Sequence, residues 1–131
     1  MSSFTDYTED LVLEWLLTTN SATRPTAWYV GLFTAAPSDP GGGTEVSGNG
    51  YARTSAAFTV SGTNPTTATN SGAVEFPAAT GGNWGTITHI AIFDADTSGN
   101  MLAWAQLTNS KTIDEGDVLR IPTSDLAITL T

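Results

Sequence analysis

The chain has 131 residues, the size of one ordinary domain, and carries four Lys and Arg against thirteen Asp and Glu, a formal net charge of −9. This acidity argues against binding to nucleic acids or to anionic membrane surfaces, because both depend on cations that neutralise phosphates. The sequence contains no cysteine, which excludes a disulfide framework and fits folding in a reducing compartment.

The first residues show no basic stretch followed by an apolar one, so we expect no secretory signal. The longest apolar run is also far shorter than the roughly 18 residues that a membrane-spanning helix needs.

Residues 1–20 are predicted to form a helix. Four large apolar residues recur there at helical spacing, namely Phe4, Tyr7, Leu11 and Trp15. Val12 and Leu16 widen this stripe to more than half of the helix circumference. We therefore expect the helix to lie against a sheet or against a neighbouring subunit.

After Arg24 the apolar period changes to two, which indicates β-strands. The predicted strands are 28–35, 51–60, 66–69, 73–76, 84–94, 101–107, 111–113, 117–122 and 126–131. Strand 84–94 is expected to be central, because both of its faces are rich in apolar residues. Short strands with turns every 8–12 residues are typical of sandwiches and barrels.

The predicted fold is therefore mainly β: a single-domain antiparallel β-sandwich or jelly-roll-like barrel with one N-terminal α-helix. The domain is expected to span 1–131, with the helix at 1–20 and the sandwich at 28–131. The predicted core consists of Trp28, Tyr29, Leu32, Phe58, Phe76, Ile90, Ile92, Trp104 and Leu119.

Residues 36–50 are predicted to form a long loop, because prolines and glycines interrupt both flanking strands. A long loop in a compact domain is usually functional. Together with the helix it forms our predicted protein interface, which comprises Phe4, Tyr7, Leu11, Trp15, Pro37, Pro40, Gly41, Gly42 and Gly43.

We find no pattern that predicts a catalytic, cofactor or metal site. His89 is the only histidine, and without cysteine or a second histidine it is expected to be a packed residue of the central strand. Asp94 could begin a calcium loop, but the twelfth position is Ala105 rather than glutamate. The carboxylates of Asp114, Glu115 and Asp117 are expected in a solvated turn rather than a catalytic groove.

Two further patterns also have structural explanations. The glycines at 41–43 and 48–50 neither open a helix nor precede a P-loop lysine, so we interpret them as turns rather than a phosphate site. Trp28, Trp84 and Trp104 could stack on sugars, but their positions in predicted strands favour packing.

The order of motifs resembles a family of small virion proteins of tailed bacteriophages, described as tail-fibre-like or head-decoration-like. The resemblance rests on residues 28–53, 72–76, 83–95, 99–107 and 113–130, about four-fifths of the chain. It implies a non-enzymatic structural protein of the virion, assembled in the bacterial host cytoplasm, without cofactors. Its expected partners are the major capsid protein or tail proteins, and a homo-oligomer is expected.

Three functions remain open at this point. Capsid decoration or cementing is favoured, because the chain is small and lacks a long fibrous shaft. A tail-fibre or receptor-binding appendage is the alternative, although the loops at 36–50 and 94–100 contain no aromatic residue. A polysaccharide depolymerase would need a carboxylate pair in a groove, which the sequence does not indicate.

Overall fold

The computed structural model describes residues 2–130, and its largest sheet has six antiparallel strands. Five follow the order β1-β9-β8-β2-β3, and β4 also pairs with β2. Their bounds are Ser2–Phe4 for β1, Tyr29–Ala35 for β2, Thr44–Glu45 for β3, Thr54–Ser55 for β4, Gly85–Phe93 for β8 and Met101–Ile113 for β9. Strand β8 is central, as predicted.

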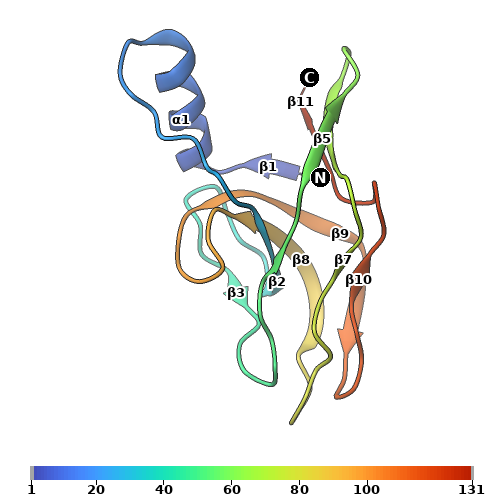
Figure 1. The fold of residues 1–131 in the computed structure, drawn as a ribbon. Helices are drawn as coiled ribbons and strands as arrows, with labels where there is room; N and C mark the ends of the chain where they lie inside the picture. The colour runs from blue at the N-terminus through green and yellow to red at the C-terminus, as the bar shows by residue number, and fades with distance from the viewer. Residues whose placement is uncertain (1, 131) are drawn as a thin grey trace.

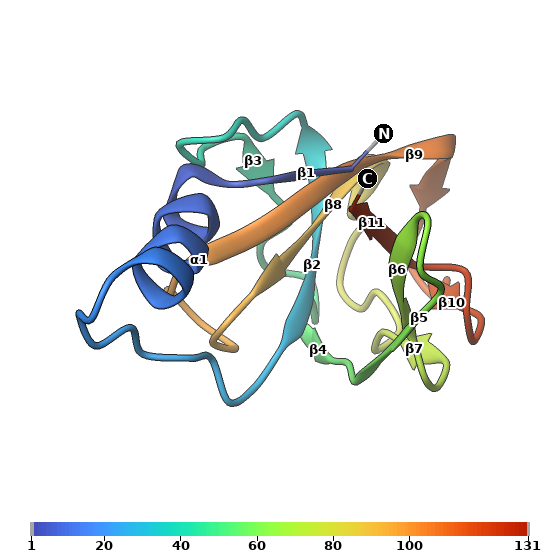
Figure 2. The ribbon, with the colours of Figure 1, turned by 90° about the horizontal axis from the view of Figure 1, so that it is seen from above.

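A second layer of short strands covers one face of this sheet at the end away from the helix (Figure 1, Figure 2). It contains the antiparallel pair β10–β7 and the antiparallel sheet β11-β6-β5. The bounds are Phe58–Ser61 for β5, Thr66–Asn70 for β6, Val74–Glu75 for β7, Arg120–Ile121 for β10 and Ala127–Leu130 for β11. The predicted mainly β, antiparallel fold is confirmed, and the sheets do not close into a barrel.

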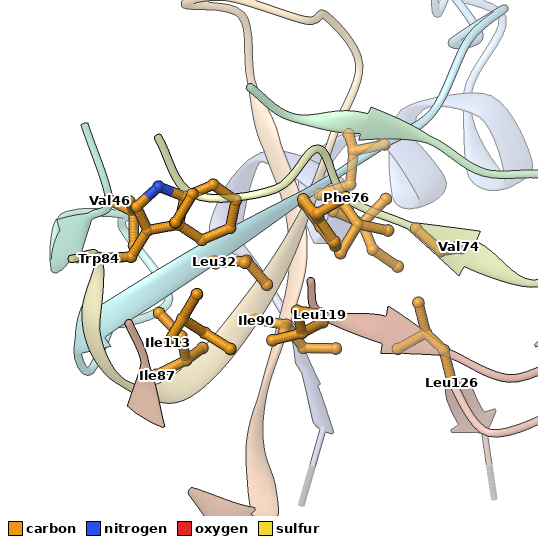
Figure 3. Close-up of a cluster of buried hydrophobic side chains, with 14 residues drawn as sticks. Leu32, Val46, Val74, Phe76, Trp84, Ile87, Ile90, Ile113, Leu119 and Leu126 are labelled. Carbon is orange, nitrogen blue, oxygen red and sulfur yellow. The ribbon is translucent and has the colours of Figure 1, made fainter. Parts of the chain in front are cut away.

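The main core lies between these two layers (Figure 3). Ile90 and Ile92 of β8 and Leu32 of β2 face Phe76 and Leu119 of the second layer, and all five are buried, as predicted. Trp28 and Phe58 are half-buried at the margin of this core, and Tyr29 and Trp104 are also half-buried.

A smaller apolar cluster covers the opposite face of the main sheet. It consists of Phe33, Ala91 and Phe93, with Met101 and Trp104 packed against them. The rings of Phe33 and Phe93 lie parallel, with their centroids 6.1 Å apart. Because β8 buries both faces, it has the apolar residues of both parities that predicted its central position.

The predicted strand 51–60 is wrong as a single element. The chain leaves β4 after Ser55 and enters the second layer as β5 at Phe58, so the two parts belong to different sheets. The separate strands predicted at 101–107 and 111–113 are instead one strand, β9, whose pairing with β8 shifts register near Ile87 and His89. A β-bulge lets a strand continue past the point where the alternation of its inward-facing and outward-facing side chains changes.

The helix is shorter than predicted. Residues 2–4 form β1, which pairs with β9, and helix α1 covers Asp6–Leu17. Thr5 caps the helix, because its side chain accepts a hydrogen bond from the amide of Thr8. Thr131, at the end of the predicted last strand, lies outside the described residues.

Candidate functional site

The start of α1 is attached firmly to β9. Thr5 is buried, and its hydroxyl donates a hydrogen bond of 2.6 Å to the carbonyl of Met101. The Thr8 hydroxyl donates one of 2.7 Å to the carbonyl of Leu102. These bonds satisfy polar groups that the sheet would otherwise bury, and they fix the direction in which the helix leaves the sheet.

The 36–50 loop is attached to both of these elements through Asp39. Its carbonyl accepts a hydrogen bond of 3.0 Å from the amide of Asp6, at the start of α1. Its carboxylate accepts one of 3.2 Å from the indole N–H of Trp104 in β9. The loop also closes on itself, because Ser38 and Gly41 exchange two backbone hydrogen bonds. The conformation of the 36–50 loop is therefore fixed by hydrogen bonds to α1, to β9 and within the loop itself.

Arg53 joins the loop to the hairpin between β8 and β9. Its guanidinium donates to both carboxylate oxygens of Glu45, with Nε 2.8 Å from Oε2 and Nη2 2.9 Å from Oε1. Its Nη1 also donates to the carbonyls of Ala95 and Ser98, at 3.0 and 2.8 Å. Paired donation of this kind fixes geometry as well as charge. One arginine thus holds two loops in a defined arrangement.

Tyr51 connects Glu45, the partner of Arg53, to strand β2. Its hydroxyl donates a hydrogen bond of 2.7 Å to Oε2 of Glu45 and accepts one of 3.0 Å from the amide of Leu32. Burial raises the pKa of Tyr51 well above its ordinary value, and the hydrogen bond to Glu45 adds to this effect. The phenol therefore remains protonated and serves as a structural donor.

A cleft of about 620 Å³ lies where these elements meet. Helix α1, the 36–50 loop, β3, Arg53 and the β8–β9 hairpin all contribute to its walls. Of the predicted interface residues, those that line it are Tyr7, Pro40, Gly41, Gly42 and Gly43.

The remaining predicted interface residues are placed elsewhere. Phe4 and Leu11 are half-buried, and Pro37, within the 36–50 loop, is buried. Trp15 is 71% exposed and does not line the cleft. The residues that the sequence reasoning missed are Asp39, Glu45 and Arg53. Arg53 could have been suspected, because it is one of only four basic residues and lies three residues after the end of the loop.

The polar groups of this cleft are largely committed to holding the structure. Both oxygens of Glu45 are bound by Arg53 and Tyr51, and Asp39 is bound by Trp104. The lining residues include no histidine, cysteine, serine or lysine. The hydroxyl of Thr5, which also lines the cleft, is bound to the carbonyl of Met101.

His89 lies outside the cleft, on the face of the main sheet that carries Phe93 of β8 and Trp104 of β9. It is half-buried and does not belong to the main core, whereas Ile87, on the other side of the register shift, does. Its Nδ1 lies 2.8 Å from the hydroxyl oxygen of Thr88, and partial burial lowers its pKa. In the part of the chain that the structure describes, no three His, Cys, Asp or Glu residues are grouped to hold a metal.

Two acidic turns have structural roles. Asp94 closes the β8–β9 hairpin, since its carboxylate accepts hydrogen bonds from the amide and the side chain of Asn100, at 2.7 and 2.9 Å. Asp117 accepts a hydrogen bond of 2.9 Å from the amide of Asp114 in an exposed turn. Both agree with the expectation of turns.

The outer surface of α1 is apolar and exposed. None of the residues from Asp6 to Leu17 is buried. Leu13, Leu16 and Leu17, which recur at i, i+3 and i+4, are 55%, 61% and 73% exposed. We call Leu13, Leu16 and Leu17 the outer surface of α1. Among residues 2–130, no helix is long and apolar enough to cross a membrane.

Comparison with known proteins identifies one family. Residues 3–129 match the model of a family described as podophage GP4 fiber I protein gp80. No curated protein matches the chain. The family match covers the helix, the 36–50 loop, the cleft and both layers of strands.

Proposed function

We propose that this chain, which belongs to the podophage GP4 fiber I protein family, is a non-catalytic structural component of a tail fibre or related tail appendage. It would act as one domain that assembles through protein–protein contacts. Two surfaces would make these contacts, the outer surface of α1 and the cleft beside the 36–50 loop.

Family membership confirms the resemblance to virion structural proteins of tailed phages, and the protein is part of the virion. It also favours a fibre over the capsid decoration that the small size of the chain suggested. The chain therefore associates with other virion components, and we propose tail proteins rather than the major capsid protein as those components.

The observation that carries this proposal is the outer surface of α1. Monomeric proteins rarely expose large contiguous apolar patches, and such patches mark interaction sites. The helix is held by Thr5 and Thr8, so its exposed side is presented in a fixed direction. A rigid element that displays large apolar side chains is suited to docking without an ordering cost.

Point variants test this proposal better than deletions. Removing residues 1–20 would also remove β1 and the bonds of Thr5 to β9. Shortening the loop at Gly43 would disturb a tight turn, since a Cβ there would lie 2.8 Å from the amide nitrogen of Pro37. Replacing exposed side chains leaves these supports in place.

The experiment adds purified protein to particles that lack it and counts the bound copies. We expect the double variant Leu13→Ser and Leu17→Ser to bind at a small fraction of the wild-type level, and Tyr7→Ser to test the cleft separately. Val60→Ser is the matched control, because Val60 is 69% exposed on β5, away from both surfaces. Full binding of both test variants contradicts the interface.

The position of the bound copies tests the role. Gold-labelled protein is expected on the tail in electron micrographs. Labels distributed over the capsid would overturn the fibre assignment and favour decoration.

A further inference from the structure

A second exposed apolar region lies far from α1, along the later part of β9. A groove of about 860 Å³ runs between β9 and the strands β10 and β11. We name it the β9–β10 groove, and its lining includes Leu107, Lys111, Val118, Arg120 and Leu126. Val118 is 48% exposed there, so the groove presents apolar surface to solvent.

The groove borders a free strand edge. Strand β1 pairs only with Ala103, Trp104 and Ala105 of β9, and β8 occupies the other side of β9. In the part of the chain that the structure describes, the outer edge of β9 beyond Ala105 has no partner strand. Open edges of this length are usually covered in native proteins.

The charges of the two regions are complementary. Helix α1 contains Asp6, Glu9, Asp10 and Glu14 and no basic residue. The groove contains two of the four basic residues of the chain, Lys111 and Arg120. Among the described residues neither cation forms an ion pair, since the one that occurs joins Arg53 to Glu45.

Acidic groups near the groove restrict how a helix can enter it. Asp125 belongs to the lining, and the turn with Asp114, Glu115 and Asp117 joins two lining residues, Ile113 and Val118. Carboxylates of an incoming helix would be repelled by that turn and attracted by Lys111 and Arg120. Only orientations that keep the acidic residues over the two cations are therefore favourable.

Helix α1 cannot fill the groove of its own molecule. The helix is fixed to the first residues of β9, whereas the groove follows its later residues, and the two regions lie on opposite sides of the fold (Figure 1, Figure 2). A contact between them must therefore form between different copies.

We infer that the partner of the outer surface of α1 is a second copy of this chain, which receives the helix in its β9–β10 groove. Leu13, Leu16 and Leu17 cover the apolar lining, and the helix carboxylates approach Lys111 and Arg120. The contact is head-to-tail, so repeated use closes a ring or extends a filament. This inference rests on the proposed function for α1, and it leaves the cleft for other virion proteins.

The absence of native cysteine allows a direct test by cross-linking. Leu16→Cys and Val118→Cys proteins are mixed under mild oxidation, and we expect a disulfide-linked pair that contains one copy of each. Leu16→Cys mixed with Val60→Cys is the matched control, since Val60 is also exposed but lies on β5. Equal cross-linking in the two mixtures overturns the inference.

A charge-reversal experiment tests the same contact without cysteine. We expect Glu9→Lys with Asp10→Lys to weaken self-association in sedimentation by about tenfold or more, and Lys111→Glu with Arg120→Glu to do the same. Mixing the two reversed proteins should restore association, because each reversed helix then meets a reversed groove. Failure of the mixture to recover overturns the inference.

These results separate the inference from the proposed function. A wild-type protein that sediments as a monomer overturns docking to a second copy. If Leu13→Ser with Leu17→Ser still prevents incorporation into particles, the virion interface stands and a different virion protein covers the helix. If self-association persists while incorporation is unaffected by that variant, both assignments of α1 fail.

Discussion

The guanidinium group of Arg53 lies over the ring of Phe93, with its central carbon 3.4 Å from the ring centroid. This cation–π contact connects the ion pair with Glu45 to the apolar cluster on the outer face of the main sheet. Arg53 thus joins the loop, the hairpin and the sheet, so its replacement should weaken the packing of all three.

Arg53→Met is expected to lower the free energy of unfolding by about 2–4 kcal/mol, because it leaves the half-buried carboxylate of Glu45 without its cation. Urea unfolding measures the change. Arg24→Met is the matched control, since Arg24 is exposed in the segment before β2. A loss below about 0.5 kcal/mol for Arg53→Met would contradict its structural role.

Gly31→Ala is expected to destabilise the protein by about 1–3 kcal/mol, because the new methyl group would be overpacked. A Cβ at Gly31 would lie 2.8 Å from Oε2 of Glu45 and 3.1 Å from Cε2 of Phe93. Thermal unfolding compares it with Gly72→Ala, where a Cβ meets nothing within 4 Å. Equal stability of the two variants would show that Glu45 and Phe93 can move aside.

Ile92→Ala is expected to cost about 2–5 kcal/mol, as large-to-small changes in a core do. Ile92 is buried in the central strand, between the two layers. The comparison is Val60→Ala, a truncation at an exposed site. Denaturant unfolding of both variants should separate them clearly, and a loss at Ile92 below about 0.5 kcal/mol would contradict the central position of β8.

Alkaline pH should destabilise the protein through Tyr51. Its pKa is raised by burial above the ordinary value of 10.0, so the unfolded state releases the proton first as the pH rises. The unfolding free energy should therefore fall above pH 10, by up to about 1.4 kcal/mol per pH unit. Tyr51→Phe should show a flatter profile, and identical profiles would refute the assignment.

Acid pH should destabilise the protein through His89. Its pKa lies below the ordinary value of 6.5, because partial burial disfavours the charged ring, so the unfolded state takes up the proton first as the pH falls. The stability contribution of neutral His89 is thus lost below pH 6.5. His89→Gln should reduce this dependence and lower stability modestly while self-association persists. Loss of a bound metal on this substitution, by elemental analysis, would reveal a ligand role instead.

Several features of the fold follow from the sequence alone. Alternating apolar residues predicted the strands, and apolar residues of both parities placed β8 in the centre of a sheet. Glycines and prolines located the 36–50 loop, apart from strand β3 within it, and five of the predicted interface residues line the cleft beside it. These features depend on residues close together in the chain, where periodicity and turn preferences act directly.

Other features depended on contacts between distant segments. The strand predicted at 51–60 divides because its two halves pair with different sheets, and residues 2–4 form a strand because β9 offers an edge. Arg53 reaches Glu45 and the hairpin carbonyls only after three segments have come together. Local preferences do not encode such pairings, because packing and hydrogen bonding between distant segments outweigh them in the folded protein.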